Sequence, residues 1–128
     1  MKPFLITAAI ACSLAACGNS DSGLINRAQK AVQEKLKDPD SAKFGEAFVL
    51  VHEENPGEDS GMRKVCGDVA AKNSYGAYDG RIRFVAFFGK PLGSKDIELL
   101  SLDLEREPND RIFESVNWQT DCKKQTAS

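Results

Sequence analysis

The stretch from Val65 to Gly80 gathers more chemically versatile side chains than any other part of the chain, with a cysteine, acids, a lysine, an asparagine and both tyrosines. One chemistry it could support is nucleophilic: the Cys66 thiol, with the only histidine, His52, as its general base. The alternative is structural, a disulfide between Cys66 and Cys122. The compartment decides between the two, because thiols persist in reducing compartments and pair in oxidising ones.

The first 17 residues indicate that compartment. One basic residue, Lys2, precedes an apolar run and then small residues, which is the layout of a secretory signal. The apolar run is too short to span a bilayer, which takes about 20 residues. It ends in Leu14-Ala15-Ala16-Cys17, which resembles the lipobox of bacterial lipoproteins. The alternative is a plain signal peptide that the general signal peptidase removes.

The lipobox resemblance implies a definite maturation. The signal peptide, residues 1–16, is removed, the Cys17 thiol receives a diacylglycerol, and the new amino terminus is acylated, typically with palmitate. Gly18 follows where an inner-membrane lipoprotein often has an acidic residue, so the resemblance implies an outer-membrane protein that faces the periplasm. Residues 17–23 would be the lipidated cysteine and a flexible tether. More than one acyl chain makes such anchoring stable.

Export favours the structural reading of the remaining cysteines. Cys12 leaves with the signal and Cys17 carries lipid, so Cys66 and Cys122 meet an oxidising environment and are predicted to form a disulfide. A closed zinc site is not expected, since two cysteines and one histidine fall short of four ligands.

Other cofactors and nucleic acid are also not expected. The acidic stretch 53–61 could suggest calcium, but its spacing does not match the EF-hand loop, and a solvated hairpin connection is the preferred interpretation. No nucleotide-binding loop is present, so no cofactor is predicted. A formal charge of −2 argues against nucleic acid as the partner.

The apolar pattern predicts one α+β domain over residues 24–123, followed by a frayed tail over 124–128. An N-terminal helix would pack on an antiparallel sheet of about four strands, with a short C-terminal helix. The predicted helices span 24–37, capped by Asp21 or Ser22, and 111–123, capped by Asp110. A single helical turn capped by Asp38 would lie between the first helix and the sheet. The predicted strands are 48–52, 63–71, 81–88 and 97–104.

Alternation assigns the strand residues to two faces. Val65, Gly67 and Val69 share one side, with Cys66 on the other. The strand 81–88 has apolar residues on both sides, which indicates burial on both faces. Gly67 indicates close approach by another segment.

Two segments carry a further resemblance. Asp38-Pro39-Asp40-Ser41-Ala42-Lys43-Phe44 and the Val-Cys-Gly strand with its Asn-rich turn, together with the late Trp118 and Cys122, resemble a group of small, uncharacterised exported bacterial proteins. The resemblance implies architecture and export, and no activity.

The sequence therefore favours a lipid-anchored, non-catalytic domain that binds an envelope protein or component. Its candidate binding surface is the polar turn with Lys72, Asn73, Tyr75, Tyr78 and Asp79. The slightly preferred alternative is that the turn serves only the backbone, since Asn and Gly are turn formers first. Two further hypotheses are an inhibitor of a foreign enzyme, such as a lysozyme, and an envelope hydrolase that uses Asp68, Lys72 or His52.

Overall fold

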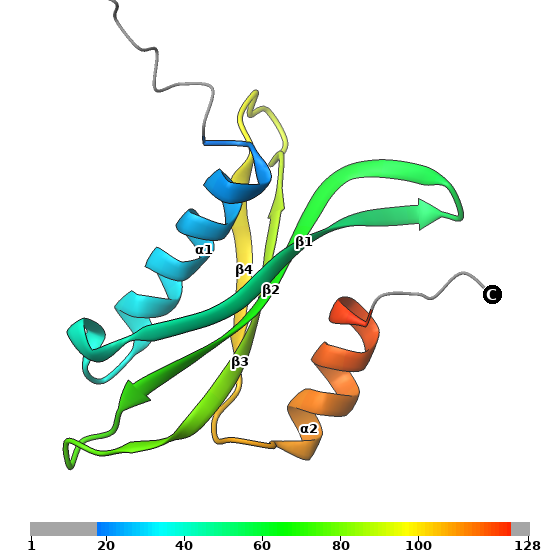
Figure 1. The fold of residues 1–128 in the computed structure, drawn as a ribbon. Helices are drawn as coiled ribbons and strands as arrows, with labels where there is room; N and C mark the ends of the chain where they lie inside the picture. Colours follow the sequence, from blue (N-terminus) through cyan, green and yellow to red (C-terminus); the bar gives the residue numbers. More distant parts are fainter. Residues whose placement is uncertain (1–17, 124–128) are drawn as a thin grey trace, which may run out of the picture.

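In the computed structural model, residues 18–123 are described, and they form an α+β domain with helices on both faces of one sheet (Figure 1). The elements in chain order are α1 (Asp21–Lys35), η2 (Pro39–Ser41), β1 (Lys43–Asn55), β2 (Glu58–Lys72), β3 (Tyr78–Gly89), β4 (Glu98–Leu104), α2 (Arg111–Phe113) and η3 (Glu114–Cys122). The predicted signal peptide, the lipidation site Cys17 and the tail 124–128 lie outside the described residues.

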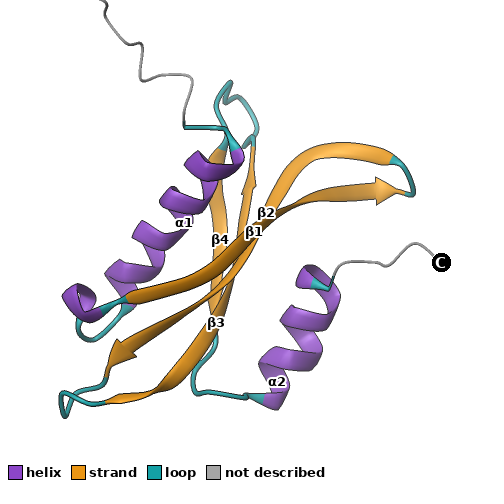
Figure 2. Ribbon diagram, viewed as in Figure 1, coloured by secondary structure: helices purple, strands orange, loops and turns teal. Residues whose placement is uncertain are grey.

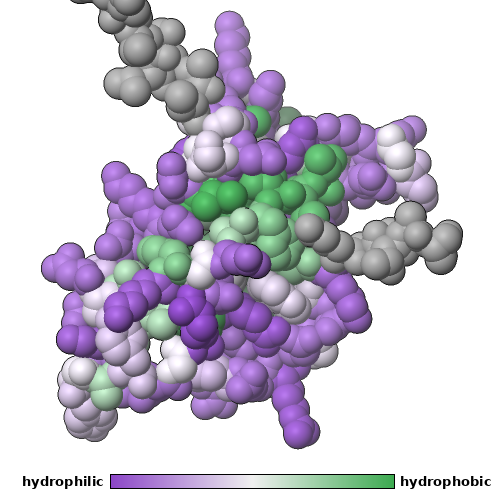
Figure 3. Space-filling model, viewed as in Figure 1, coloured by the Kyte–Doolittle hydropathy of each residue, from purple (hydrophilic) through white to green (hydrophobic). Residues whose placement is uncertain are grey.

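The four strands form an antiparallel meander in the order β1-β2-β3-β4 (Figure 2). The fold class predicted from the sequence is therefore confirmed. Each consecutive pair of strands is joined by a short connection, which is the arrangement that antiparallel pairing allows. β1 is an edge strand, and its apolar middle lies at the surface in Figure 3, where hydrophobic residues gather in a patch over it.

One face of the sheet packs against α1. Leu24, Ala28 and Val32 recur at helical spacing and are buried against a set of strand residues on that face: Val65, Val69, Phe84, Ala86 and Phe88. Gly67 lies among them, and a Cβ there would stand 2.8 Å from the Phe84 ring, so the predicted close approach is confirmed.

The opposite face packs against the C-terminal helix. Cys66 and Val85 are buried there with Phe113 and Cys122, and Phe48 and Trp118 pack at their edge. The two-sided burial predicted for the strand 81–88 is thus correct. The helix begins as α2 and continues as the π-helix η3, and Asp110 caps it by accepting hydrogen bonds from the N–H groups of Ile112 and Phe113.

Several predicted boundaries were wrong. α1 begins at Asp21, so residues 21–23 of the predicted tether form its first turn, and the cap is Ser20, whose hydroxyl accepts from the Gly23 N–H. The predicted single turn exists as η2, but the Asp38 side chain makes no capping hydrogen bond.

The acidic stretch 53–61 was predicted as a loop and is mostly strand. Glu53 pairs with Asp59 and Asn55 with Glu58, so β1 and β2 extend as a hairpin arm to a tight turn at Gly57. β3 likewise begins at Tyr78, earlier than predicted. Acidic residues are locally unfavourable in strands, but cross-strand pairing and a turn with glycine at positive φ outweigh that local preference.

Candidate functional site

Asn73 organises the β2–β3 turn, residues 73–77. Its side-chain oxygen accepts hydrogen bonds from the N–H groups of Tyr75 (2.9 Å) and Ala77 (3.2 Å). Its amide nitrogen donates to the Asp79 carboxylate at 2.6 Å. An asparagine that replaces backbone partners in this way is a turn-forming residue. Asn73 and Asp79, both members of the predicted binding surface, therefore shape the turn.

Tyr78 joins the same turn to the segment before β1. Its hydroxyl donates to the Ser41 carbonyl at 2.8 Å, and the Lys43 ammonium lies 4.8 Å from the ring centroid. The Lys72 ammonium lies 6.0 Å from the centroid of the same ring, and the backbone N–H of Lys72 donates to the Ser41 hydroxyl. Tyr75, in contrast, is 94% exposed at the tip of the turn. Of the five predicted residues, Lys72 and Tyr75 keep their charged or aromatic groups available to a partner.

A groove with a volume of about 470 Å³ lies beside this turn, where α1 ends. Half-buried apolar side chains form its floor. They come from the C-cap of α1, from β2, β3 and β4, and from the segment after β4: Leu36, Ala71, Ile82, Leu104 and Pro108. Four exposed cationic side chains surround them: Lys35, Lys37, Lys72 and Arg106. We call this site the basic groove.

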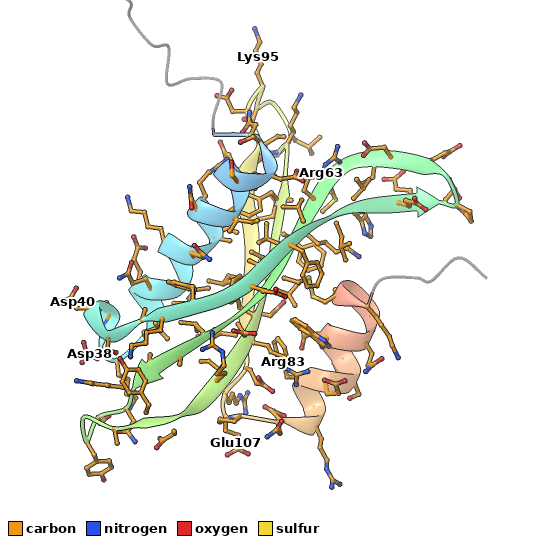
Figure 4. All side chains as sticks on the ribbon, viewed as in Figure 1. Asp38, Asp40, Arg63, Arg83, Lys95 and Glu107 are labelled. Carbon is orange, nitrogen blue, oxygen red and sulfur yellow. A yellow bond between two sulfur atoms is a disulfide. The ribbon has the colours of Figure 1, made fainter. Side chains whose placement is uncertain are left out.

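Acidic residues also line the basic groove, and two of them are engaged by hydrogen bonds within the domain. Glu105 is buried and its carboxylate is bound by Arg83, while Asp79 accepts the hydrogen bond from Asn73. Glu107 is exposed at the rim, and Figure 4 shows it at the end of the molecule where the segment after β4 turns toward the C-terminal helix. The groove thus combines an apolar floor with an excess of cations, which suits a ligand with an apolar body and an anionic group.

The basic groove includes three residues of the predicted surface, Lys72, Asn73 and Asp79. Sequence reasoning missed Lys35, Lys37 and Arg106 as groove residues, because the end of α1 and the segment after β4 lie far apart in the sequence. The only local signal was a surplus of lysine at the end of the first helix, which is also the ordinary charge preference of a helix C-terminus.

Arg83 is the main ionic junction outside the groove. Its guanidinium binds Glu105 and Glu114 and lies 5.0 Å from the Trp118 ring centroid and 5.6 Å from that of Phe113 (Figure 4). The hydrogen bonds from Arg83 and from Gln119 hold the pKa of Glu114 below its usual value. The Glu105 hydrogen bond raises the pKa of Arg83 further above its usual value. Arg83 therefore fastens the C-terminal helix to the sheet.

The predicted disulfide is present. Cys66 and Cys122 are bonded, with their Cα atoms 5.9 Å apart, and both side chains are buried. Such a bond engages both sulfur atoms, so the alternative of a Cys66 nucleophile served by His52 does not apply to this structure.

The three acid–base candidates of the hydrolase hypothesis lie apart. Asp68 accepts a hydrogen bond from Arg81 at 2.7 Å, and Lys72 lines the basic groove. The pairing of Val51 with Arg63 and of Glu53 with Asp59 sets His52 about ten residues from Lys72 along β2, roughly 30 Å. The three groups cannot act on one bond.

His52 instead lines a second hollow of about 330 Å³ together with Lys64 and Asp121. Burial raises the pKa of the Asp121 carboxyl, and the nearby Asp103 raises it further. Lys64 and His52 act in the opposite direction. Within residues 18–123, no three His, Cys, Asp or Glu side chains converge as metal ligands would.

Comparison with protein-family models, with curated proteins and with solved structures finds no match to this chain. The resemblance to lipoproteins and to small exported proteins therefore stays a prediction. Among residues 18–123, no helix is both long enough and apolar enough to cross a bilayer.

Proposed function

We propose that this protein is a lipid-anchored component of the cell envelope whose domain binds an anionic partner, without catalysis, in the basic groove. The lipid on Cys17 would hold it to a membrane, most simply the outer membrane on its periplasmic side. The partner would be an envelope protein or component with an acidic, partly apolar segment.

The position of the basic groove relative to the attachment point carries this proposal. Gly18 precedes α1 at one end, and the groove is lined by Lys35, the last residue of α1, at the other. The helix has 15 residues, so the two ends are about 22 Å apart. Figure 1 shows the β2–β3 turn at the end of the molecule opposite the entry of the chain into α1. A domain anchored at Cys17 would present the groove to the space away from the membrane.

Two measurements test the anchor. Intact-mass spectrometry of the chain purified from membranes should show a product that starts at Cys17 and carries acyl groups, and Cys17→Ser should release the domain into the soluble fraction. A membrane-free wild-type product that starts at another residue would exclude the lipid anchor.

Site-specific photocrosslinking in the native envelope tests the groove. A photoreactive residue at position 37, on the groove rim, should give a discrete crosslinked product. The matched control is position 30, an exposed lysine on α1, the helix that precedes position 37, and it does not line the groove.

Charge reversal completes this test. Lys72→Glu should abolish the position-37 product, because the cation would become an anion facing an anionic ligand, whereas Lys30→Glu should leave it. Equal products from positions 37 and 30, or a product unaffected by Lys72→Glu, would exclude the basic groove as the binding site.

A further inference from the structure

The connection between β3 and β4 carries the most exposed large apolar side chain of residues 18–123. The tip is a turn in which the Ser94 N–H donates to the Pro91 carbonyl at 3.0 Å and Gly93 takes a φ of 81°. This geometry sets Leu92 at the corner of the turn, where it is fully exposed. Because the Leu92 side chain is fully exposed, covering it with an apolar phase would remove its whole apolar surface from water.

The same connection lies beside the end of the domain that joins Cys17. Arg27 of α1 donates to the Ile97 carbonyl at 2.9 Å and to the Gly18 carbonyl at 3.4 Å, and its guanidinium lies over the Phe88 ring at 5.1 Å. One arginine thus holds the first described residue next to the end of the β3–β4 connection. Figure 4 shows Lys95 at that end of the molecule, pointing away from the domain beside the start of α1.

From this juxtaposition we propose that the β3–β4 turn is a second membrane contact, in which Leu92 enters the interface of the bilayer that holds the lipid of Cys17. The inference rests on the lipid anchor of the proposed function. Cys17 is one residue from Gly18, and one residue spans at most about 3.8 Å between Cα atoms. The acylated end and the turn therefore meet the same surface, and the turn fixes the orientation of the domain on it.

The charges near Leu92 define the kind of contact. Lys90 and Lys95 are exposed on either side of the turn and can extend toward phosphate groups while Leu92 enters the apolar layer. Asp96 and Glu98 follow closely and balance the two lysines. The contact is therefore apolar in origin, and we expect it to depend little on the anionic lipid content of the bilayer.

Fluorescence quenching on vesicles tests the proposal. The full lipidated chain, with Leu92→Cys labelled by an environment-sensitive dye, is reconstituted into vesicles of phosphatidylethanolamine and phosphatidylglycerol. The matched control is Ile112→Cys, an exposed apolar position on the C-terminal helix. We expect nitroxide-labelled lipid to quench the dye at position 92, with a blue shift of its emission, and to leave position 112 unquenched. Vesicles of phosphatidylcholine alone should give nearly the same quenching.

Three outcomes would overturn the proposal. In the first, soluble iodide quenches positions 92 and 112 equally and nitroxide lipid quenches neither. In the second, position 92 is shielded from iodide but not quenched by nitroxide lipid, so another protein chain covers it. In the third, quenching is lost without anionic lipid.

Vesicle flotation separates this inference from the anchor itself. If the wild-type chain does not float with the vesicles, the lipid anchor fails and the second contact fails with it. If the chain floats but position 92 stays in water, only the second contact fails. As a further check, Leu92→Ser should reduce nitroxide quenching of a dye at position 95 while flotation is retained.

Discussion

Glu105 and Arg83 are joined through both backbone and side chain. The Glu105 N–H donates to the Arg83 carbonyl at 2.8 Å, and the Glu105 carboxylate accepts from the Arg83 N–H at 2.8 Å and from its guanidinium at 2.7 Å. The same carboxylate accepts from the Asp110 N–H, the residue that caps the C-terminal helix. One buried acid therefore fixes the end of the sheet, the connection that follows it and the start of the helix.

Glu105→Ala should lower the free energy of unfolding by about 3–5 kcal/mol, because it leaves Arg83 without its buried partner. Glu107→Ala, at an exposed position two residues on, should change it by less than about 0.5 kcal/mol. Urea unfolding followed by Trp118 fluorescence measures both. The double variant Arg83→Met, Glu105→Leu should recover part of the loss, and equal losses for Glu105→Ala and Glu107→Ala would contradict the assigned role.

The Glu114–Arg83 pair should make stability depend on pH in the acid range. The pKa of Glu114 is lowered in the folded state from a usual value of 4.5, so its contribution is present above that pH and is lost as the pH falls below it. Glu114→Gln should be less stable than the wild type at neutral pH, and the difference should shrink below a pH of about 4.5. Urea titrations of both chains over that range measure it. A difference that stays constant with pH would show that Glu114 gains nothing from its charge.

Reduction of the Cys66–Cys122 disulfide should lower the free energy of unfolding. The bond closes a sequence separation of 56 residues, for which loop entropy gives about 4 kcal/mol. Urea unfolding of the same chain with and without a reductant, followed by Trp118 fluorescence, measures the effect. Trp118 packs edge-on to Phe48 at 6.3 Å, so it reports detachment of the C-terminal helix. Identical midpoints would mean that packing alone holds the helix.

Substitution of Asn73 should cost much more stability than substitution of Tyr75, although both residues lie in the β2–β3 turn. Asn73→Ala removes three hydrogen bonds and should cost about 1–2 kcal/mol. Tyr75→Ala removes an exposed side chain and should change stability by less than about 0.5 kcal/mol. Thermal unfolding of the two variants compares them. A larger loss for Tyr75→Ala would disprove the assignment of Asn73 as the residue that closes the turn.

Gly67→Ala should destabilise the domain by about 1–3 kcal/mol, because its methyl group would overlap the Phe84 ring. Gly18→Ala, at a position where a Cβ meets nothing within 4 Å, serves as the control and should be nearly neutral. Urea titration of both variants measures their free energies of unfolding. Phe84→Leu in the Gly67→Ala background should relieve the overlap, and unchanged stability in the single variant would contradict the close approach.

The regular elements were predictable where periodicity was strong. The apolar pattern predicted a helix over 24–37, which corresponds to α1, and alternation along β2 separated Val65 and Val69 from Cys66. The acidic arm was not predictable, because the pairing of Glu53 with Asp59 is a cross-strand interaction that acidic side chains do not signal.

The candidate site was predictable only in part. The turn composition pointed to Lys72 and Asp79, but Lys35, Lys37 and Arg106 reach the same groove from the end of α1, from the segment just after it and from the segment after β4. No local pattern relates these segments. The same holds for Arg27, whose bonds to Gly18 and Ile97 set the end of the β3–β4 connection beside Gly18, the first described residue.

The amino-acid sequence by itself determined the fold class, the pairing of Cys66 with Cys122 and the expectation of a lipid on Cys17, since each depends on composition, spacing or a local motif. Only the tertiary structure decided which residues meet at the two ends of the molecule. Packing α1 across the sheet sets Ile97, at the end of the β3–β4 connection, near Gly18 at one end and gathers the cations of the basic groove at the other. Those groupings arise from long-range pairing and packing, which no single stretch of sequence encodes.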